Sequence, residues 1–436
     1  MKSIPPNKVT LTLQTDRAFI SLVTAFMENA ALAQGLARRE ALALTLAAEE
    51  LFTYLCQLLG PKNDLEIHCL RGGYYVRADF LTAAGELNLR AFNLTSSVSP
   101  EDEASLEELG LLLASRSVDH FNLVQDRQRV VLSLTKEKAY PAYEKKGLVA
   151  APRPGDYEMI RPGPAEMKWF GQIVGEFYSP LEVPPALQYP GKLADMIESG
   201  EYQAVLARER SGEVAGGLLW RTAGEKTGEF FGPYIFPPGS SPDRAQALID
   251  FCLTALARTR VVGLINRWPT SDLPWLFFET LGSLTYFDPE GQRNEVVHYF
   301  RQIAEDPGST VWVVPELETF LRGEYRRLVL PRGFHLARYF GEALPPFSVL
   351  STALDRTRKT VTLRPVLTGA DIEENIRRHL LLFQRERIRN IYFELDLGQF
   401  WQADFALPLS KNGFSPRIII PYGGLGDLLI FQGKAA

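Results

Sequence analysis

The chain has 436 residues, of which 46% are hydrophobic and 23% charged, and its formal net charge is −5. This composition is typical of soluble globular proteins, and the length exceeds what one hydrophobic core organises, so we expect several domains. The negative net charge disfavours nucleic acid and anionic membranes as partners.

The three cysteines, Cys56, Cys69 and Cys252, are far apart in the sequence, and each lies in an apolar run. They form no Cys/His cluster, so we expect buried thiols in a reducing cytoplasm and no metal site. The N-terminal residues lack the apolar segment of a signal peptide, and no stretch approaches roughly 20 uninterrupted apolar residues. The sequence therefore predicts a cytoplasmic protein without a membrane span.

Residues 1–140 are predicted to form a helix layer on a mixed sheet. Helical periodicity indicates three helices, at 16–36, 38–59 and 106–118. Alternating apolar residues indicate strands at 9–13, 65–70, 74–80, 119–123 and 129–134.

The end of this region carries a resemblance to a known family. The runs LGLLL from Leu109, RSVD from Arg116 and VVLSLTK from Val130 resemble the histidine-kinase-type ATPase fold of anti-sigma-factor serine kinases. The resemblance implies a vestigial nucleotide site at Glu50, Asp79 and Gly110. Independently of the family, Glu50 is also read as the solvated edge of a core helix.

Two departures from that family affect its chemistry. Tyr54 stands where the family has a Mg-binding Asn, and Leu81 stands where an adenine-binding turn has Gly. Tyr is not a suitable ligand for Mg²⁺, and a leucine side chain obstructs close approach of the base. We therefore expect neither kinase activity nor ATP hydrolysis, and ATP is a doubtful ligand.

Residues 141–155 mix Pro, Gly and charge without periodicity and are predicted to be a linker. Residues 156–305 then follow the order strand, two helices, three strands, helix, strand, helix, strand. With the hairpin around Gly212 and the sequence FETLG from Phe278, this order resembles the GNAT family of acetyl-CoA-dependent N-acetyltransferases. The predicted fold class is α/β (α+β).

The stretch from Gly228 to Leu256 is a strand, a Pro/Gly/Ser loop and an amphipathic helix. The first backbone N–H groups of a helix can bind an anion, although most such turns bind none. The GNAT resemblance implies that this loop holds the pyrophosphate of acetyl-CoA or another acyl-CoA. The implied cofactor-binding residues are Phe236, Ser240, Ser241, Arg244 and Ala245.

The match is incomplete at three positions. Ser240 replaces the family's Arg, and Asp243 replaces a Gly and brings a carboxylate that repels phosphate. Phe278, predicted on a helix at 273–281, replaces the Tyr that acts as general acid in many family members. Tyr286 and His298 are the candidate substitutes, and the alternative is that both are structural.

Residues 306–436 resemble a second, more degenerate copy of the GNAT fold. Strands are predicted at 349–355, 360–365 and 390–394, helices at 371–386 and 400–409, and a closing strand pair at 417–421 and 427–432. The basic run from Arg377 is interspersed with Glu and apolar residues, which favours a solvated helix face over a nucleic-acid site.

The sequence leaves two functions open, and with them the question of whether the chain is an enzyme. One is an acyl-CoA-binding, acetyltransferase-like regulatory protein of bacterial signalling with a degenerate nucleotide domain. The other is a non-catalytic interaction or scaffold protein in stress or sigma-factor regulation. For the second, an unidentified protein partner is expected.

Overall fold

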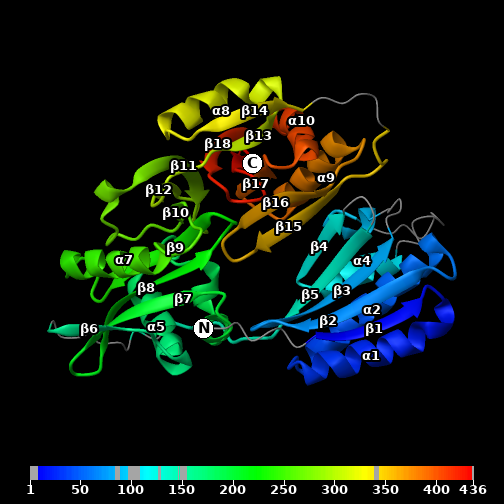
Figure 1. Ribbon diagram of the computed structural model, residues 1–436, viewed down its shortest axis with the longest axis horizontal. Helices are drawn as coiled ribbons and strands as arrows, with labels where there is room; N and C mark the ends of the chain where they lie inside the picture. Colours follow the sequence, from blue (N-terminus) through cyan, green and yellow to red (C-terminus); the bar gives the residue numbers. More distant parts are fainter. Residues whose placement is uncertain are drawn as a thin grey trace. The chain divides into compact units, whose positions relative to one another are not determined.

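The computed structural model describes residues 8–83, 89–96, 109–125, 129–145, 147, 155–337 and 343–434. It is a mixed α/β structure, as predicted, and it divides into two compact units (Figure 1). Unit 1 comprises residues 1–139, 341–353 and 363–386, and unit 2 comprises residues 140–340, 354–362 and 387–436. The domain boundaries at 140, 155 and 305 remain predictions. The observed units differ from them by grouping two later segments with the N-terminal region.

Unit 1 contains a five-stranded antiparallel sheet in the order β1-β2-β3-β5-β4. Its elements confirm the predicted order in the described residues: β1 (Lys8–Gln14), α1 (Ile20–Ala33), α2 (Arg38–Leu59), β2 (Asp64–Arg71), β3 (Tyr75–Ala83), α4 (Leu109–Ser117), β4 (His120–Gln125) and β5 (Arg129–Glu137). Residues 106–108 of the predicted third helix lie outside the described residues. The sheet is antiparallel throughout, where a mixed one was predicted.

Helix α2 forms the centre of this unit. It is the one helix in the described part of the chain that is long and apolar enough to cross a membrane by length and composition. Its inward residues, among them Leu44, Leu51 and Phe52, are fully buried in the core of unit 1. α2 is therefore a core helix of unit 1.

The two later segments of unit 1 include α9 (Ile372–Arg385) and the outer parts of β15 (Val349–Asp355) and β16 (Thr360–Leu367). Val349 is 1% exposed and belongs to the same hydrophobic core as α2. The tip of the β15–β16 hairpin, residues 354–362, belongs to unit 2.

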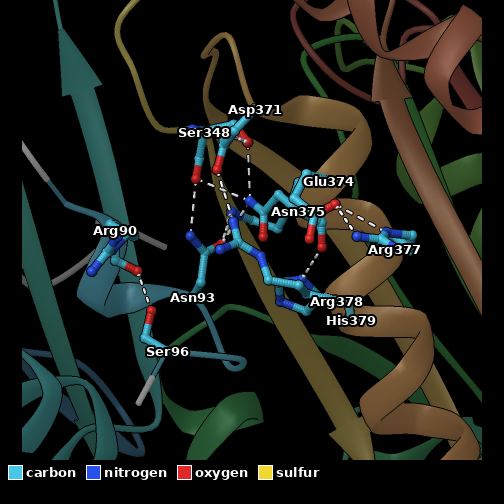
Figure 2. Close-up of polar contacts among 11 residues, drawn as sticks. Arg90, Asn93, Ser96, Ser348, Asp371, Glu374, Asn375, Arg377, Arg378 and His379 are labelled. Carbon is cyan, nitrogen blue, oxygen red and sulfur yellow. Dashed lines mark hydrogen bonds and ion pairs between the residues drawn. The ribbon is translucent and has the colours of Figure 1, made fainter. Parts of the chain in front are cut away.

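A buried asparagine attaches these segments to residues 89–96 (Figure 2). The Asn93 side chain accepts from the Leu350 N–H (2.9 Å) and donates to the Ser348 carbonyl (2.9 Å). Asn375 on α9 donates to Asn93 (3.1 Å) and to the same carbonyl (3.0 Å). Asn93 therefore satisfies one N–H and one C=O of the chain entering β15, as a neighbouring strand would.

Unit 2 begins with the segment that resembles an acetyltransferase. Its elements are β6 (Tyr157–Ile160), α5 (Pro164–Phe177), α6 (Pro190–Glu198), β7 (Gln203–Glu209), β8 (Val214–Thr222), β9 (Thr227–Ile235), α7 (Pro242–Leu256), β10 (Gly263–Asn266), β11 (Glu279–Phe287) and β12 (Arg293–Gln302). They form a seven-stranded sheet in the order β11-β12-β10-β9-β8-β7-β6, in which β9 and β10 are parallel. The predicted element order is confirmed except at one helix.

That exception is residues 273–281. A short 3-10 turn, η4 (Trp275–Phe277), stands in place of the predicted helix, and β11 begins at Glu279. Glu279 and Thr280 pair with Phe300 and Tyr299 of β12, and the register shifts before Gly282. The prediction of a helix here was wrong because pairing with β12 overrides the local periodicity.

Two further strand groups follow, both of which lie in unit 2 except for the outer parts of β15 and β16. β13 (Ser309–Val313) and β14 (Arg332–Leu336) are parallel and are connected by α8 (Pro315–Arg327). The final sheet has the order β15-β16-β17-β19-β18 and adds β17 (Asn390–Asp396), β18 (Ser415–Ile420) and β19 (Leu428–Gln432), with α10 (Ala406–Lys411) before β18. The relation of residues 306–436 to a second acetyltransferase copy remains a prediction.

Candidate functional site

The predicted phosphate loop is a well-formed strand-to-helix turn. Ser241 caps α7, and its hydroxyl accepts from the Arg244 N–H (3.4 Å). Pro242 occupies the first helical position and contributes no N–H. Ser240 is exposed and Ser241 half-buried, whereas Phe236 and Ala245 are each 1% exposed in the core of unit 2. Only the two serines therefore face a position that a ligand could reach.

The Gly239 N–H, which precedes α7, already binds an anion of the protein itself. It donates to Asp272 Oδ1 (2.7 Å), and the other carboxylate oxygen lies 2.5 Å from the Tyr178 hydroxyl. Burial raises the pKa of Asp272. The Ser240 N–H donates to the Pro237 carbonyl (3.3 Å). The loop donors at 239 and 240 thus have protein partners.

Arg244 points into unit 2 and away from the loop. It donates to Glu209 (2.8 Å) on β7 and to the Ala215 carbonyl (3.3 Å), and its guanidinium carbon lies 4.8 Å from the centre of the Tyr157 ring. The side chains of Arg244 and Glu209 are 6% and 3% exposed. Asp243 is exposed in the first turn of α7. Because the Arg244 guanidinium is bound to Glu209 in the core, it does not offset the negative charge of Asp243.

Beyond Glu229, strand β9 runs on without a strand partner on its β10 side, because β10 pairs only with residues 227–229. Such an edge could receive an extended ligand as an added strand. Here the carbonyls of Gly232 and Pro233 accept from Asn266 (2.9 Å) and Thr270 (2.7 Å). Pro233 has no N–H to offer.

The backbone N–H and carbonyl of Ile235, the last residue of β9, also have a side chain as their partner. The Ile235 N–H donates to the Tyr178 hydroxyl (2.6 Å), and the Ile235 carbonyl lies 2.9 Å from that hydroxyl. A ligand that pairs with this edge must displace three side chains of the protein. The residues present therefore do not fit an acyl-CoA held by this loop and strand edge.

The two candidate catalytic residues are not brought together. Tyr286 on β11 pairs with Asn294 of β12, whereas His298 pairs with Gly282, which lies four residues before Tyr286 in β11. The Tyr286 hydroxyl donates to the Arg358 carbonyl (3.2 Å), and burial raises its pKa. His298 is 5% exposed, and burial with the nearby Arg267 charge lowers its pKa to about 4. Phe278 is buried in the core, and its side chain has no proton to transfer.

Unit 2 also contains a buried carboxylate, Glu229, that the sequence did not predict. Glu229 on β9 is fully buried and accepts from Arg267 (2.6 Å) and Arg221 (2.7 Å). Although burial alone opposes ionisation, the two arginines bring the pKa of Glu229 down to about 2. A general base with so low a pKa is inefficient at neutral pH. The available signal was a lone Glu inside an apolar strand, which needs a buried partner.

In unit 1, two of the three implied nucleotide residues meet. A Cβ added at Gly110 would collide with the Glu50 carboxylate, so α4 and α2 bring these residues together. Asp79 is 7% exposed and is paired with Arg77 (2.9 Å) on the same strand. Burial, followed by the neighbouring Glu49 charge, raises the pKa of Glu50.

Metal ligands do not gather in the described part of the chain: no group of three or more His, Cys, Asp or Glu there could hold an ion. Cys56, Cys69 and Cys252 are all free and buried, as predicted.

No protein-family model and no curated protein matches this sequence. Among solved structures, the chain is similar to a putative acetyltransferase from Acinetobacter baylyi ADP1, at 12% identity over 34% of this chain and 92% of that one, with a TM-score of 0.29. It is also similar to a GNAT-superfamily phosphinothricin acetyltransferase from Sinorhizobium meliloti in complex with AcCoA, at 15% identity over 34% and 90% of the chains, with a TM-score of 0.29.

A third similar structure is the GNAT-family N-acetyltransferase YhbS from Escherichia coli in complex with CoA, at 14% identity over 36% and 86% of the chains, with a TM-score of 0.26. Similarity at this level says nothing about the activity of this chain.

Proposed function

We propose that this protein is a non-catalytic interaction protein whose second unit has an acetyltransferase-like sheet but no working cofactor site. The observation that supports an interaction role is the turn η4. Its three residues are large, apolar and exposed, with Trp275 at 58%, Leu276 at 78% and Phe277 at 59%. Contiguous exposed apolar residues of this size typically mark a binding surface.

The absence of catalysis is inferred from the groups that the chemistry would need. The loop N–H of Gly239 is bound to Asp272, and Arg244 is bound to Glu209. His298 and Glu229 have pKa values of about 4 and about 2, far below those of general acids or bases that work near pH 7. A cytoplasmic, regulatory role in bacterial signalling, with a protein partner, is part of the same proposal.

Acyl-CoA binding is the second candidate, and one observation favours it. The loop before α7 still receives an anion, although that anion is the Asp272 carboxylate. An acyl-CoA could bind there only by displacing Asp272, and the protein would then be an acyl-CoA-responsive regulator.

The interaction role can be tested by affinity capture with the full chain. Leu276→Ser with Phe277→Ser removes the apolar turn, and Leu425→Ser is a matched control because Leu425 is 80% exposed elsewhere in unit 2. We expect a partner recovered by the wild type and by the control, but not by the double variant. Equal recovery by all three proteins would contradict the proposed surface.

The absence of catalysis is tested separately by thiol release from acetyl-CoA with a panel of amines. We expect no release above the protein-free rate. Release that Tyr286→Phe or His298→Gln abolishes would establish an acetyltransferase instead.

A further inference from the structure

The hairpin tip of unit 2 carries a buried arginine whose charge is poorly compensated. Arg358 is 6% exposed, and its guanidinium donates to the Val183 carbonyl (2.8 Å). The amide oxygen of Gln188, in the orientation that satisfies both groups, accepts from Nε (3.1 Å) and Nη2 (2.6 Å). Nη1 is buried and has no hydrogen-bond partner among the described residues. The nearest carboxylate, that of Asp355, lies 3.8 Å from Nε.

Three other buried or partly buried arginines of unit 2 each have a close carboxylate. Arg244 has a carboxylate at 2.8 Å, Arg267 has one at 2.6 Å, and Arg332 has two, at 2.7 and 2.8 Å. Nearby carboxylates raise the pKa of Arg267 and Arg332, whereas burial lowers that of Arg358. A buried cation without a close counter-charge is costly, and such positions are typical of ligand sites.

The surroundings of Arg358 suit a small anion. The guanidinium carbon lies 5.2 Å from the centre of the Trp268 ring, a geometry in which a ring supports a cation. Gln188, Trp268 and Asp355 around it are all partly exposed. Displacement of the Gln188 amide would leave both Nη1 and Nη2 available as donors.

We propose that Arg358 anchors a binding site for a small anionic ligand, a carboxylate or phosphate group that binds at Nη1 beside Trp268. Guanidinium groups pair with both kinds of oxyanion, and the chemistry they share is a compact anionic group with several acceptor oxygens. This site is separate from the loop before α7 and does not require that loop to bind a cofactor.

The experiment is a thermal unfolding series on the full chain with sodium acetate and, separately, sodium phosphate, each against sodium chloride at equal ionic strength. We expect a saturable rise in Tm of about 2–4 °C with at least one of the two anions. The Arg358→Met variant should lose this response. Arg258→Met, at an exposed arginine of unit 2, is the matched control and should keep it.

The two anion arms decide which class of ligand the site takes. If Arg358→Met does not fold, Arg358→Lys provides the second test, because it keeps the charge but not the planar fork and should need several-fold more anion for half of the effect. The proposal is overturned if neither anion exceeds chloride in the wild type, or if Arg358→Met or a folded Arg358→Lys responds as the wild type does.

Discussion

Arg244 shows how a residue at a family's binding loop can serve the core instead. Its pair with Glu209 is buried on both sides, so removing one partner leaves an uncompensated charge. We predict that Glu209→Gln lowers the free energy of unfolding by about 3–5 kcal/mol. The double variant with Arg244→Met should recover part of that loss, because it removes the orphaned charge.

Urea denaturation of the two single variants and the double variant measures this coupling. Strictly additive effects would show that Arg244 and Glu209 do not interact.

Tyr54 of unit 1 leads to a second prediction, on ATP hydrolysis. Tyr54 packs against the core of unit 1, and its phenol is not one of the carboxylate, carbonyl or water oxygens that usually bind Mg²⁺. We predict that the full chain releases no phosphate from Mg·ATP above background. Tyr54→Asn alone should not restore turnover, because Leu81 is unchanged. Phosphate release that Glu50→Ala abolishes would contradict this prediction.

The sequence could indicate which residue types occupy the predicted sites, but it could not indicate which way they point. The missing Tyr at Phe278 and the extra charge at Asp243 are visible in the sequence. That Arg244 faces Glu209, and that Asp272 binds the loop, depends on residues 35 and 33 positions away. Such contacts between distant residues cannot be read from spacing along one segment.

At the scale of elements, Asn93 joins residues 89–96 to β15 and α9. Its amide satisfies backbone groups that are buried, and unsatisfied groups of this kind each cost about 1–3 kcal/mol. We predict that Asn93→Ala lowers the free energy of unfolding by about 3 kcal/mol and accelerates hydrogen exchange at the Leu350 amide. The control is Ser96→Ala, which removes only a local bond to the Arg90 carbonyl.

If the two variants are equally stable and exchange at Leu350 is unchanged, Asn93 does not hold β15. Because α9 and part of β15 belong to unit 1, the test uses the full chain and not a fragment of residues 1–140.

Most elements with strong periodicity could be predicted from the sequence, as α2, α7 and β9 show. Residues 273–281 could not, because their pattern fits a helix while their pairing with β12 is non-local. Gly282 has φ +134°, a conformation that does not occur in an α-helix. A single glycine in the sequence does not by itself predict this conformation.

At the scale of the whole molecule, two buried neutral histidines predict sensitivity to acid. His298 faces Arg267, Glu229 and Glu394, and His379 faces Arg378 and Arg116 and bonds to the Asn375 carbonyl (2.9 Å). Burial lowers each pKa from 6.5 to about 4. The free energy of unfolding is therefore not reduced by these histidines above pH 6.5. As the pH drops toward 4 it falls by about 3 kcal/mol per histidine, because the unfolded chain binds protons that the folded protein does not.

Urea denaturation between pH 7 and 4 measures this dependence. His298→Gln and His379→Gln should each flatten the decline, whereas His335→Gln, at an exposed position, should not. A decline of unchanged slope in both buried-histidine variants would assign the acid sensitivity to other groups.

In unit 2, carboxylates of the protein itself bind the Gly239 N–H and Arg244, the groups that would otherwise hold the cofactor. Calorimetric titration of acetyl-CoA into the full chain, with Asp243→Gly alongside, tests whether they exclude it. We predict no saturable heat in either protein at about 1 mM ligand, because removing the Asp243 charge frees neither the Gly239 N–H nor Arg244. Saturable binding to the wild type that tightens several-fold in Asp243→Gly would contradict this prediction and establish an acyl-CoA site at the loop before α7.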